Sequence, residues 1–231
     1  MTTTAMGEGK ASFEVNTIRE WVGPLHRQLI RNFNDRHESL EKDDREAADE
    51  LDQLVPPLME EFEATEAPRA ENPQWLIWKM RAGWHVARGD YEEALNCEVE
   101  GYKHAEAEPD RPETRVATAR RRSVSASNIA DELRRLGRAH EALKWARLSI
   151  ELWPSNTINH LVLAMAVYRA GYPAEAGRII AELLNAVELG DDKDTLANCM
   201  AFERELHEMR DLDPAIRSLL GSLASRQDKK G

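Results

Sequence analysis

The chain has 231 residues, of which 42% are apolar and 32% charged, a balance typical of a foldable globular protein. Its net charge of -11 and pI near 5.2 argue against a general attraction to nucleic acid or to an anionic membrane, because the field of the whole protein repels phosphate. No apolar run is long enough for a signal peptide or a membrane span, and Cys97 and Cys199 are far apart. The sequence therefore predicts a cytoplasmic protein without a disulfide framework.

The first part of the chain has the pattern of an acidic helical region. Apolar residues recur at helical spacing in residues 13–21 and 25–40, on either side of Gly23-Pro24. The same spacing continues in residues 43–55 and 58–64, on either side of Pro56-Pro57. We predict that residues 12–66 form helices packed on the rest of the protein, after a disordered tail over residues 1–11.

Three short strings farther along the chain share one pattern: a glycine, three variable residues, a glutamate and an alanine. They begin at Gly89, Gly137 and Gly171. The last two begin 34 residues apart, from 137 to 171, and this period is typical of a helix-turn-helix solenoid. The first begins 48 residues before the second, from 89 to 137, and we expect residues 108–122 to accommodate the additional length as a longer loop or as longer helices.

Amphipathic helices are predicted on both sides of these glycines. A glycine adopts the left-handed conformation that closes a helix, so Gly137 lets the chain turn back antiparallel within a few residues. Ala142 and Ala176 are small enough for the paired helices to approach closely. Pro154 is expected to end the second helix of its pair, and Pro173 fits the first turn of a helix.

These features resemble a known family. Residues 123–188 are similar to two tetratricopeptide repeats (TPRs), and residues 75–108 resemble a degenerate copy in which Trp78, Ala82 and His85 hold the family's positions. Glu98 stands where the family favours an aromatic residue, and Glu188 stands where it favours proline. The resemblance implies an all-α, TPR-like helix-turn-helix solenoid.

The solenoid is expected to span residues 74–225. Residues 195–209 and 214–223 have the spacing of one more helix and a short capping helix, which a solenoid needs to cover its last apolar face. Residues 226–231 complete the chain as a second disordered tail.

Charge is distributed unevenly along the chain. Residues 35–66 hold thirteen acidic and three basic residues, whereas residues 111–147 hold ten basic and four acidic ones. The acidic segment is interpreted as a solvated helical face, with the alternative that it covers the basic helices. The cluster Arg120-Arg121-Arg122 opens a helix, where a nearby acidic partner is expected because positive charge opposes the helix dipole.

Candidate chemistry is sparse. We find no phosphate-binding glycine loop, no Gly-x-Ser-x-Gly motif and no His-Glu-x-x-His motif. His85, Cys97 and His104 form a weak candidate zinc site, for which a packed thiol and two structural histidines are the alternative. His37 and Glu41, one helical turn apart, are interpreted as a local ion pair rather than a metal site. No catalytic residue, metal or cofactor is predicted.

The resemblance also implies a function. In this family the first helix of each pair lines a concave groove that holds an extended or helical peptide of a partner. We therefore expect a protein–protein interaction module, such as an adaptor, a scaffold or a chaperone-like protein. From helix phase, the candidate groove residues are Lys79, Asn128, Asp131, Arg134, Arg135, Met165, Tyr168 and Arg169.

The partner is expected to be another protein, and an acidic peptide would suit the groove arginines. Lys79 and Asn128 resemble part of a clamp with which some relatives hold a terminal carboxylate, but Gly83, Ile158 and Val162 occupy other positions of that clamp. The full clamp is therefore not predicted. The alternatives are a helical enzyme or metal-binding protein, and a subunit that builds a homo-oligomer.

Overall fold

The described chain folds into helices joined by short turns. The computed structural model describes residues 23–109 and 111–189, with side chains up to residue 183, and this part contains no strand. The elements are α1 (Pro24–Lys42), α2 (Arg45–Thr65), the 3₁₀ helix η1 (Ala67–Arg69), α3 (Pro73–Arg88), α4 (Tyr91–Glu106), α5 (Arg115–Arg135), α6 (Ala139–Leu152), α7 (Thr157–Arg169) and α8 (Pro173–Leu189). The prediction of an all-α fold is confirmed. The helices expected in residues 13–21, 195–209 and 214–223, like both predicted tails, lie outside the described residues.

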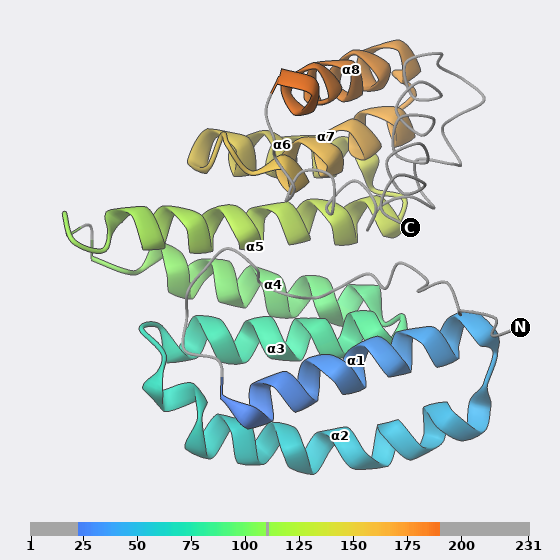
Figure 1. Cartoon of the computed structure of the whole chain (residues 1–231), viewed down its shortest axis with the longest axis vertical. Coiled ribbons are helices and arrows are strands. Elements are labelled where there is room, and N and C mark those ends of the chain that lie inside the picture. Colours follow the sequence, from blue (N-terminus) through green and yellow to red (C-terminus); the bar gives the residue numbers. More distant parts are fainter. Residues whose placement is uncertain (1–22, 110, 190–231) are drawn as a thin grey trace, which may run out of the picture.

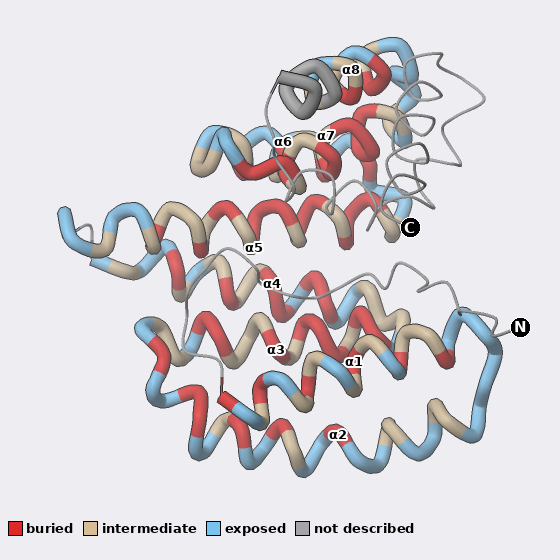
Figure 2. Tube along the Cα trace, viewed as in Figure 1, coloured by how far each residue is buried: buried red, intermediate tan, exposed pale blue. Residues whose placement is uncertain are grey.

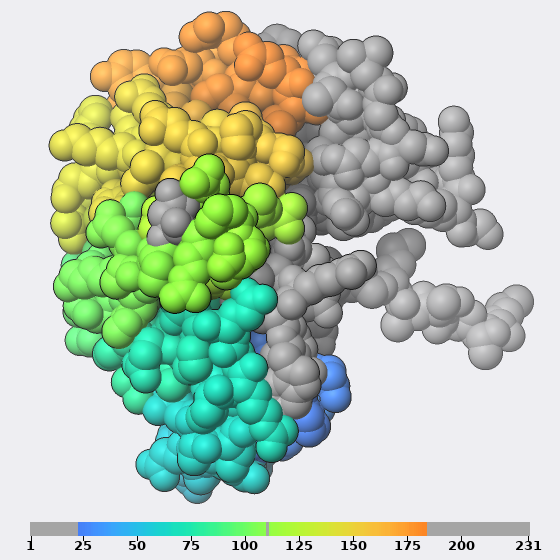
Figure 3. All heavy atoms as spheres, turned by 90° about the vertical axis from the view of Figure 1, so that its left-hand side faces the viewer, coloured from blue at the N-terminus to red at the C-terminus, as the bar shows by residue number. Residues whose placement is uncertain are grey.

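Consecutive helices pack in pairs, and the pairs follow one another along the molecule in chain order (Figures 1 and 3). The pairs are α1–α2, α3–α4, α5–α6 and α7–α8. The first helices of neighbouring pairs contact each other directly between α1 and α3 and between α5 and α7. Among the described helices, α3 and α5 differ from this arrangement because they are joined chiefly through α4.

The turns within the pairs have one geometry. Gly89, Gly137 and Gly171 have φ values of 78°, 77° and 92°, so each adopts the left-handed conformation. In each turn the glycine N–H donates to the carbonyl three residues back, and the next N–H donates to the carbonyl five residues back. These two hydrogen bonds satisfy carbonyl groups in the last turn of the helix. The predicted role of the three glycines is confirmed.

A fourth turn of this kind lies in the acidic region, where the sequence pattern gave no repeat. Asp43 has φ 52°, and the N–H of Asp44 donates to the Ser39 carbonyl at 2.9 Å. Asp44 then accepts from the N–H of Ala47 and caps α2. The α1–α2 pair therefore ends its first helix as the other pairs do, with aspartate in place of glycine.

Pro56 and Pro57 do not interrupt their helix. The sequence predicted separate segments on either side of them, but α2 runs continuously from Arg45 to Thr65. Both prolines are exposed, whereas Val55, Met59 and Phe62 are buried against the rest of the protein. Packing of this apolar face on both sides of the prolines offsets the lost backbone hydrogen bonds.

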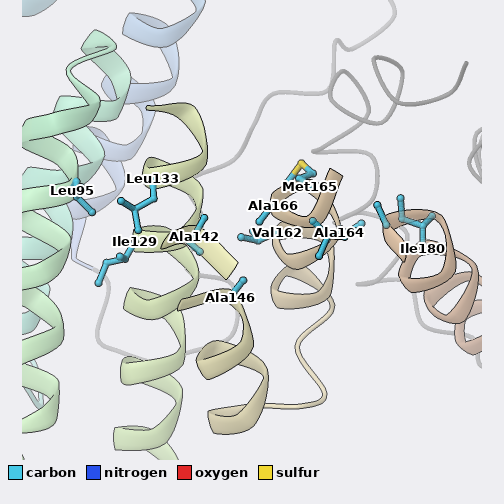
Figure 4. Close-up of a cluster of buried hydrophobic side chains, with 14 residues drawn as sticks. Leu95, Ile129, Leu133, Ala142, Ala146, Val162, Ala164, Met165, Ala166 and Ile180 are labelled. Carbon is cyan, nitrogen blue, oxygen red and sulfur yellow. The ribbon is translucent and has the colours of Figure 1, made fainter. Parts of the chain in front are cut away.

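Two apolar clusters hold the described helices together. The first joins α1, α2, η1 and α3 and includes Leu29, Phe33, Val55, Phe62 and Trp75. The second extends from α4 through α5, α6 and α7 to α8, and Figure 4 shows its labelled side chains in a row from Leu95 to Ile180. Figure 2 shows the consequence: α5 and α7 are buried on most sides, whereas α2 is exposed along much of its length.

The small residues after the turns lie where the paired helices cross. Ala94, Ala142 and Ala176 have no exposed surface, and Ala142 and Ala176 belong to the second apolar cluster. A larger side chain would have to displace its neighbours, because protein interiors are close-packed. Pro154 follows the end of α6, and Pro173 opens α8, as predicted.

The additional length before Gly137 is divided between a connecting loop and the long helix α5. Arg121 is buried in the second turn of α5 and donates to both carboxylate oxygens of Glu108, at 2.7 and 2.6 Å. It also donates to Glu71 at 3.1 Å, and Asn72 and Thr118 donate to Glu108 as well. Because α5 begins at Arg115, the arginine cluster does not open the helix as predicted; Arg121 nevertheless has an acidic partner, Glu108, which fastens the loop to the stack.

The acidic helices do not lie over the basic segment. On α2, Asp52 accepts from Arg36 of α1 at 2.9 Å, and Glu63 accepts from Arg81 of α3 at 2.8 and 2.6 Å. Beyond the end of α2, Glu66 accepts from the backbone N–H groups of Leu25 and His26. Because α2 directs its apolar face toward α1 and η1, it lies at the end of the stack away from α5 (Figure 1). The acidic helix α2 therefore does not cover the basic helix α5, contrary to the alternative considered from the sequence.

Candidate functional site

The candidate site is a polar network at the junction of α3, α4 and α5, between the two apolar clusters. At its centre is Glu98 of α4, which is 2% exposed. Its Oε1 accepts from Lys79 Nζ of α3 at 2.8 Å and from Asn128 Nδ2 of α5 at 2.6 Å. Its Oε2 is buried and has no hydrogen-bond partner. Burial raises the pKa of this carboxyl, against the opposing effect of Lys79, Asn128 and the Ser125 hydroxyl.

The position of Glu98 within its pair explains why the network forms there. Glu98 lies nine residues after the turn residue Gly89, and the equivalent positions in the next two pairs are Ala146 and Ile180, both fully buried and apolar. In the first pair the equivalent residue is Asp52, which also accepts from a basic side chain, Arg36. A carboxylate paired with a basic side chain of the facing helix therefore replaces the apolar residue in the two N-terminal pairs, and at Glu98 this pairing compensates for burial.

A second group of charges follows along α5. Asp131 Oδ1 accepts from Arg134 Nη2 at 2.6 Å and from Arg134 Nε at 2.9 Å, and its Oδ2 accepts from Arg135 Nε at 2.9 Å. The spacing of three and four residues places all three side chains on one helix face. Although burial alone would raise the pKa of Asp131, Arg135 and Arg134 hold it well below the usual range. The Arg135 guanidinium also lies 5.3 Å from the centre of the Tyr91 ring on α4.

Glu132, the next residue on α5, is the group that this arrangement leaves without a cation. It is 4% exposed, and its Oε2 is buried with no hydrogen-bond partner. Burial raises its pKa to about 8, with further contributions from Asp131 and Glu98, while Arg135 and Lys79 oppose the shift. Near neutral pH the Glu132 carboxyl is therefore largely protonated.

The eight sequence-predicted residues fall into two groups. Five of them belong to the two hydrogen-bonded groups: Lys79 and Asn128 bind Glu98, whereas Arg134 and Arg135 bind Asp131. The other three lie on α7: Met165 is 2% exposed within the second apolar cluster, Tyr168 is half-buried against the same cluster, and Arg169 is exposed at the end of the helix. Met165 therefore presents almost no surface to a partner in this conformation.

Glu98 and Glu132 were absent from the predicted set. Helix phase assigned Glu98 to an otherwise apolar position of the second helix, and the departure from the family pattern was the only available signal. Glu132 adjoins the selected Asp131 but lies about 100° away around the helix. The signal that could have pointed to the network was a charged residue, Glu98, at a position where the family pattern favours an aromatic residue.

The other candidate chemical groups do not form a site within the described residues. Within the described residues, no three or more histidine, cysteine or acidic side chains lie close enough together to hold a metal ion. His85, Cys97 and His104 therefore do not form the candidate zinc site. Cys97 is buried, and burial raises the pKa of its thiol to about 11, so the reactive thiolate is scarce at neutral pH. His37 Nε2 lies 3.9 Å from Glu41, consistent with the local pairing expected from their spacing.

Comparison with known proteins gives no further assignment. A scan against models of known protein families finds no match, and searches of curated proteins and of solved structures find no significant similarity. Among the described helices, none has both the length and the apolar composition that crossing a membrane requires.

Proposed function

We propose that this protein is a protein–protein interaction module of the TPR type, which holds a peptide or helix of its partner against the face built by α3, α4 and α5. The recurring turn at Asp43, Gly89, Gly137 and Gly171 supports a repeat architecture, because each turn follows the first helix of a pair. Proteins built from stacked helix pairs present extended surfaces, and binding to other macromolecules is the common use of such surfaces.

The observation that carries the proposal is that predicted groove residues of α3 and α5 belong to two neighbouring hydrogen-bonded groups, one at Glu98 and one at Asp131. Hydrogen bonds hold Lys79 of α3 and Asn128 of α5 at the buried Glu98 carboxylate, and a second set holds Arg135 at Asp131 on α5. The network reaches the surface, since the side chains of Lys79, Asp131 and Arg135 are 15%, 17% and 25% exposed. Polar groups that are already held in place lose little conformational entropy when a partner binds.

The test combines partner capture with paired variants of the full chain. The variant Lys79→Met with Glu98→Leu removes both members of the ion pair, so neither charge remains buried without a partner. The control is Arg147→Ala, on the exposed side of α6. Proteins that cross-link to the wild-type chain in lysate of the producing cells are identified by mass spectrometry and then purified for binding titrations.

We expect the double variant to lose binding to the identified partner while the control retains it, with the same helical circular dichroism for all three chains. Equal binding by the double variant would place the partner elsewhere and contradict the proposal. Light scattering of the wild-type chain alone identifies the competing case, in which the chain associates only with copies of itself.

A further inference from the structure

The charges in the network are shared unequally among its three carboxyl groups. Asp131 receives two guanidinium groups, from Arg134 and Arg135. Glu98 receives Lys79 and the Asn128 amide, both at Oε1, which leaves Oε2 without a donor. Glu132 Oε2 has no donor either. In their ionised forms, both carboxyl groups therefore lack a hydrogen-bond donor at Oε2.

Two buried carboxyl oxygens without donors point to a ligand that supplies them. A buried acceptor without a hydrogen bond costs free energy that a donor on a partner would recover. The strongest donors to a carboxyl group are ammonium and guanidinium groups, because opposite charge adds to the hydrogen bond. Lysine and arginine carry their charge on a long flexible stem, and the side chains of Lys79, Asp131 and Arg135 beside the two glutamates are partly exposed.

We propose that the surface above Glu98 and Glu132 docks its partner through a lysine or arginine side chain, which supplies the hydrogen-bond donors missing at the two Oε2 atoms. This inference rests on the proposed function and specifies its partner. It also revises the expected preference for an acidic peptide, because Lys79, Arg134 and Arg135 already hold carboxylates of this chain.

Docking of a cation should be linked to loss of a proton. The groups that face Glu132 are Lys79 from α3, Glu98 from α4, and Asp131 and Arg135 from α5. With these cations already engaged, the carboxyl favours its protonated form until another positive charge arrives. Partner affinity should therefore increase with pH across the range in which Glu132 titrates, by up to about tenfold per pH unit for one proton released.

The experiment selects ligands from a random-peptide display library against the immobilised full chain. In parallel, the same library is selected against Glu132→Gln and against Glu151→Gln, a matched change at an exposed position of α6. We expect the wild type and Glu151→Gln to enrich one motif with a lysine or arginine at a fixed position. Glu132→Gln, which keeps the shape of the protonated side chain, should lose that enrichment.

The best peptide is then titrated against all three proteins by fluorescence anisotropy. Replacing its enriched arginine by citrulline, or its enriched lysine by norleucine, should weaken binding to wild type at least about tenfold, and Glu132→Gln should weaken it similarly. The citrulline or norleucine peptide keeps this test valid even if Glu132→Gln alters the fold.

The outcomes separate the two proposals. Enrichment of acidic peptides or free carboxyl termini, or of a basic motif that Glu132→Gln binds equally well, would overturn the inference while leaving the interaction module intact. Failure of the wild-type chain to enrich any peptide above an empty surface would contradict both the inference and the peptide-binding function on which it rests.

Discussion

The neighbouring residues Asp131 and Glu132 show how local contacts separate the behaviour of two carboxyl groups. Asp131 accepts hydrogen bonds from Arg134 and Arg135 on its helix face, whereas Glu132 Oε2 is buried without a hydrogen-bond partner. The pKa of Asp131 is lowered and that of Glu132 is raised, to about 8. At this scale, one position along a helix decides whether a buried acid is ionised.

Because the pKa of Glu132 is raised in the folded chain, its titration should make the fold less stable as the pH rises. Between about pH 4.5 and pH 8 the folded chain retains a proton on Glu132 that the unfolded chain has lost, so the free energy of unfolding falls across this window. Asp131 has the opposite sign, but it acts only below the ordinary pKa of aspartate, 3.8. Glu132→Gln should raise the melting temperature by several degrees at about pH 9 and have little effect at about pH 5.

Circular dichroism melts at the two pH values measure this difference, with Glu141→Gln as a control. Glu141 is exposed on α6, and its substitution should leave the pH dependence unchanged. If Glu132→Gln and wild type lost the same stability between about pH 5 and pH 9, Glu132 would not be the titrating group.

The alanine after a turn should tolerate no enlargement. Ala142 has no exposed surface and lies in the second apolar cluster between α5, α6 and α7 (Figure 4). Ala142→Leu adds volume to a close-packed crossing and should cost about 1 to 3 kcal/mol of unfolding free energy in a urea titration. Glu141→Leu adds a similar side chain at an exposed site and should cost less than about 0.5 kcal/mol. Equal stability of both variants would refute the helix register.

At the scale of the element, the turn explains why the helix pair α1–α2 was not recognised from the sequence pattern. A left-handed residue closes the first helix of every described pair, and glycine holds it at Gly89, Gly137 and Gly171. The sequence pattern is defined by that glycine, so it does not include the pair whose turn contains Asp43. Aspartate adopts this conformation more readily than most residues, which is why the geometry persists without glycine.

Substitution of the turn glycine tests its backbone role alone. A Cβ on Gly137 would meet no atom within 4 Å, so Gly137→Ala should be destabilising by about 1 kcal/mol solely because alanine disfavours positive φ. Gly101 lies inside α4, where a Cβ would make ordinary contacts at 3.5 Å and beyond. The same substitution there should be neutral or stabilising by up to about 1 kcal/mol. If urea denaturation showed that both substitutions change the free energy of unfolding in the same direction, this explanation would be wrong.

For the whole molecule, the sequence predicted where the helices lie along the chain better than how they pack against one another. Helix phase placed Lys79, Asn128 and Asp131 among the groove residues, and the network contains all three. Asp131 pairs locally on α5, but the pairing of Lys79 and Asn128 through Glu98 depends on α4 lying between α3 and α5, a long-range arrangement that local periodicity does not encode. For the same reason Met165 was assigned to the groove, although the packing of α7 buries it.

The same arrangement changes the expected effect of removing the acidic region. From the charges alone, deletion of residues 1–66 would uncover the basic segment and raise partner affinity. In the structure, however, α1 and α2 supply Leu29, Phe33, Val55, Met59 and Phe62 to the first apolar cluster. Full burial of one such side chain contributes about 1.5 to 3 kcal/mol, so their loss exceeds what the exposed ion pairs of α2 contribute.

Deletion of residues 1–66 should therefore destabilise α3 and leave its apolar face uncovered. Trp75, Leu76, Met80 and Trp84 would lose their packing partners, whereas the second cluster, from α4 to α8, would keep its own. We expect the truncated chain to self-associate in light scattering, and hydrogen exchange to increase in α3 far more than in α6 and α7. Because the driving force is apolar, added salt should not restore the monomer. A monomeric truncated chain with wild-type protection in α3 would show that α1 and α2 are dispensable for the fold.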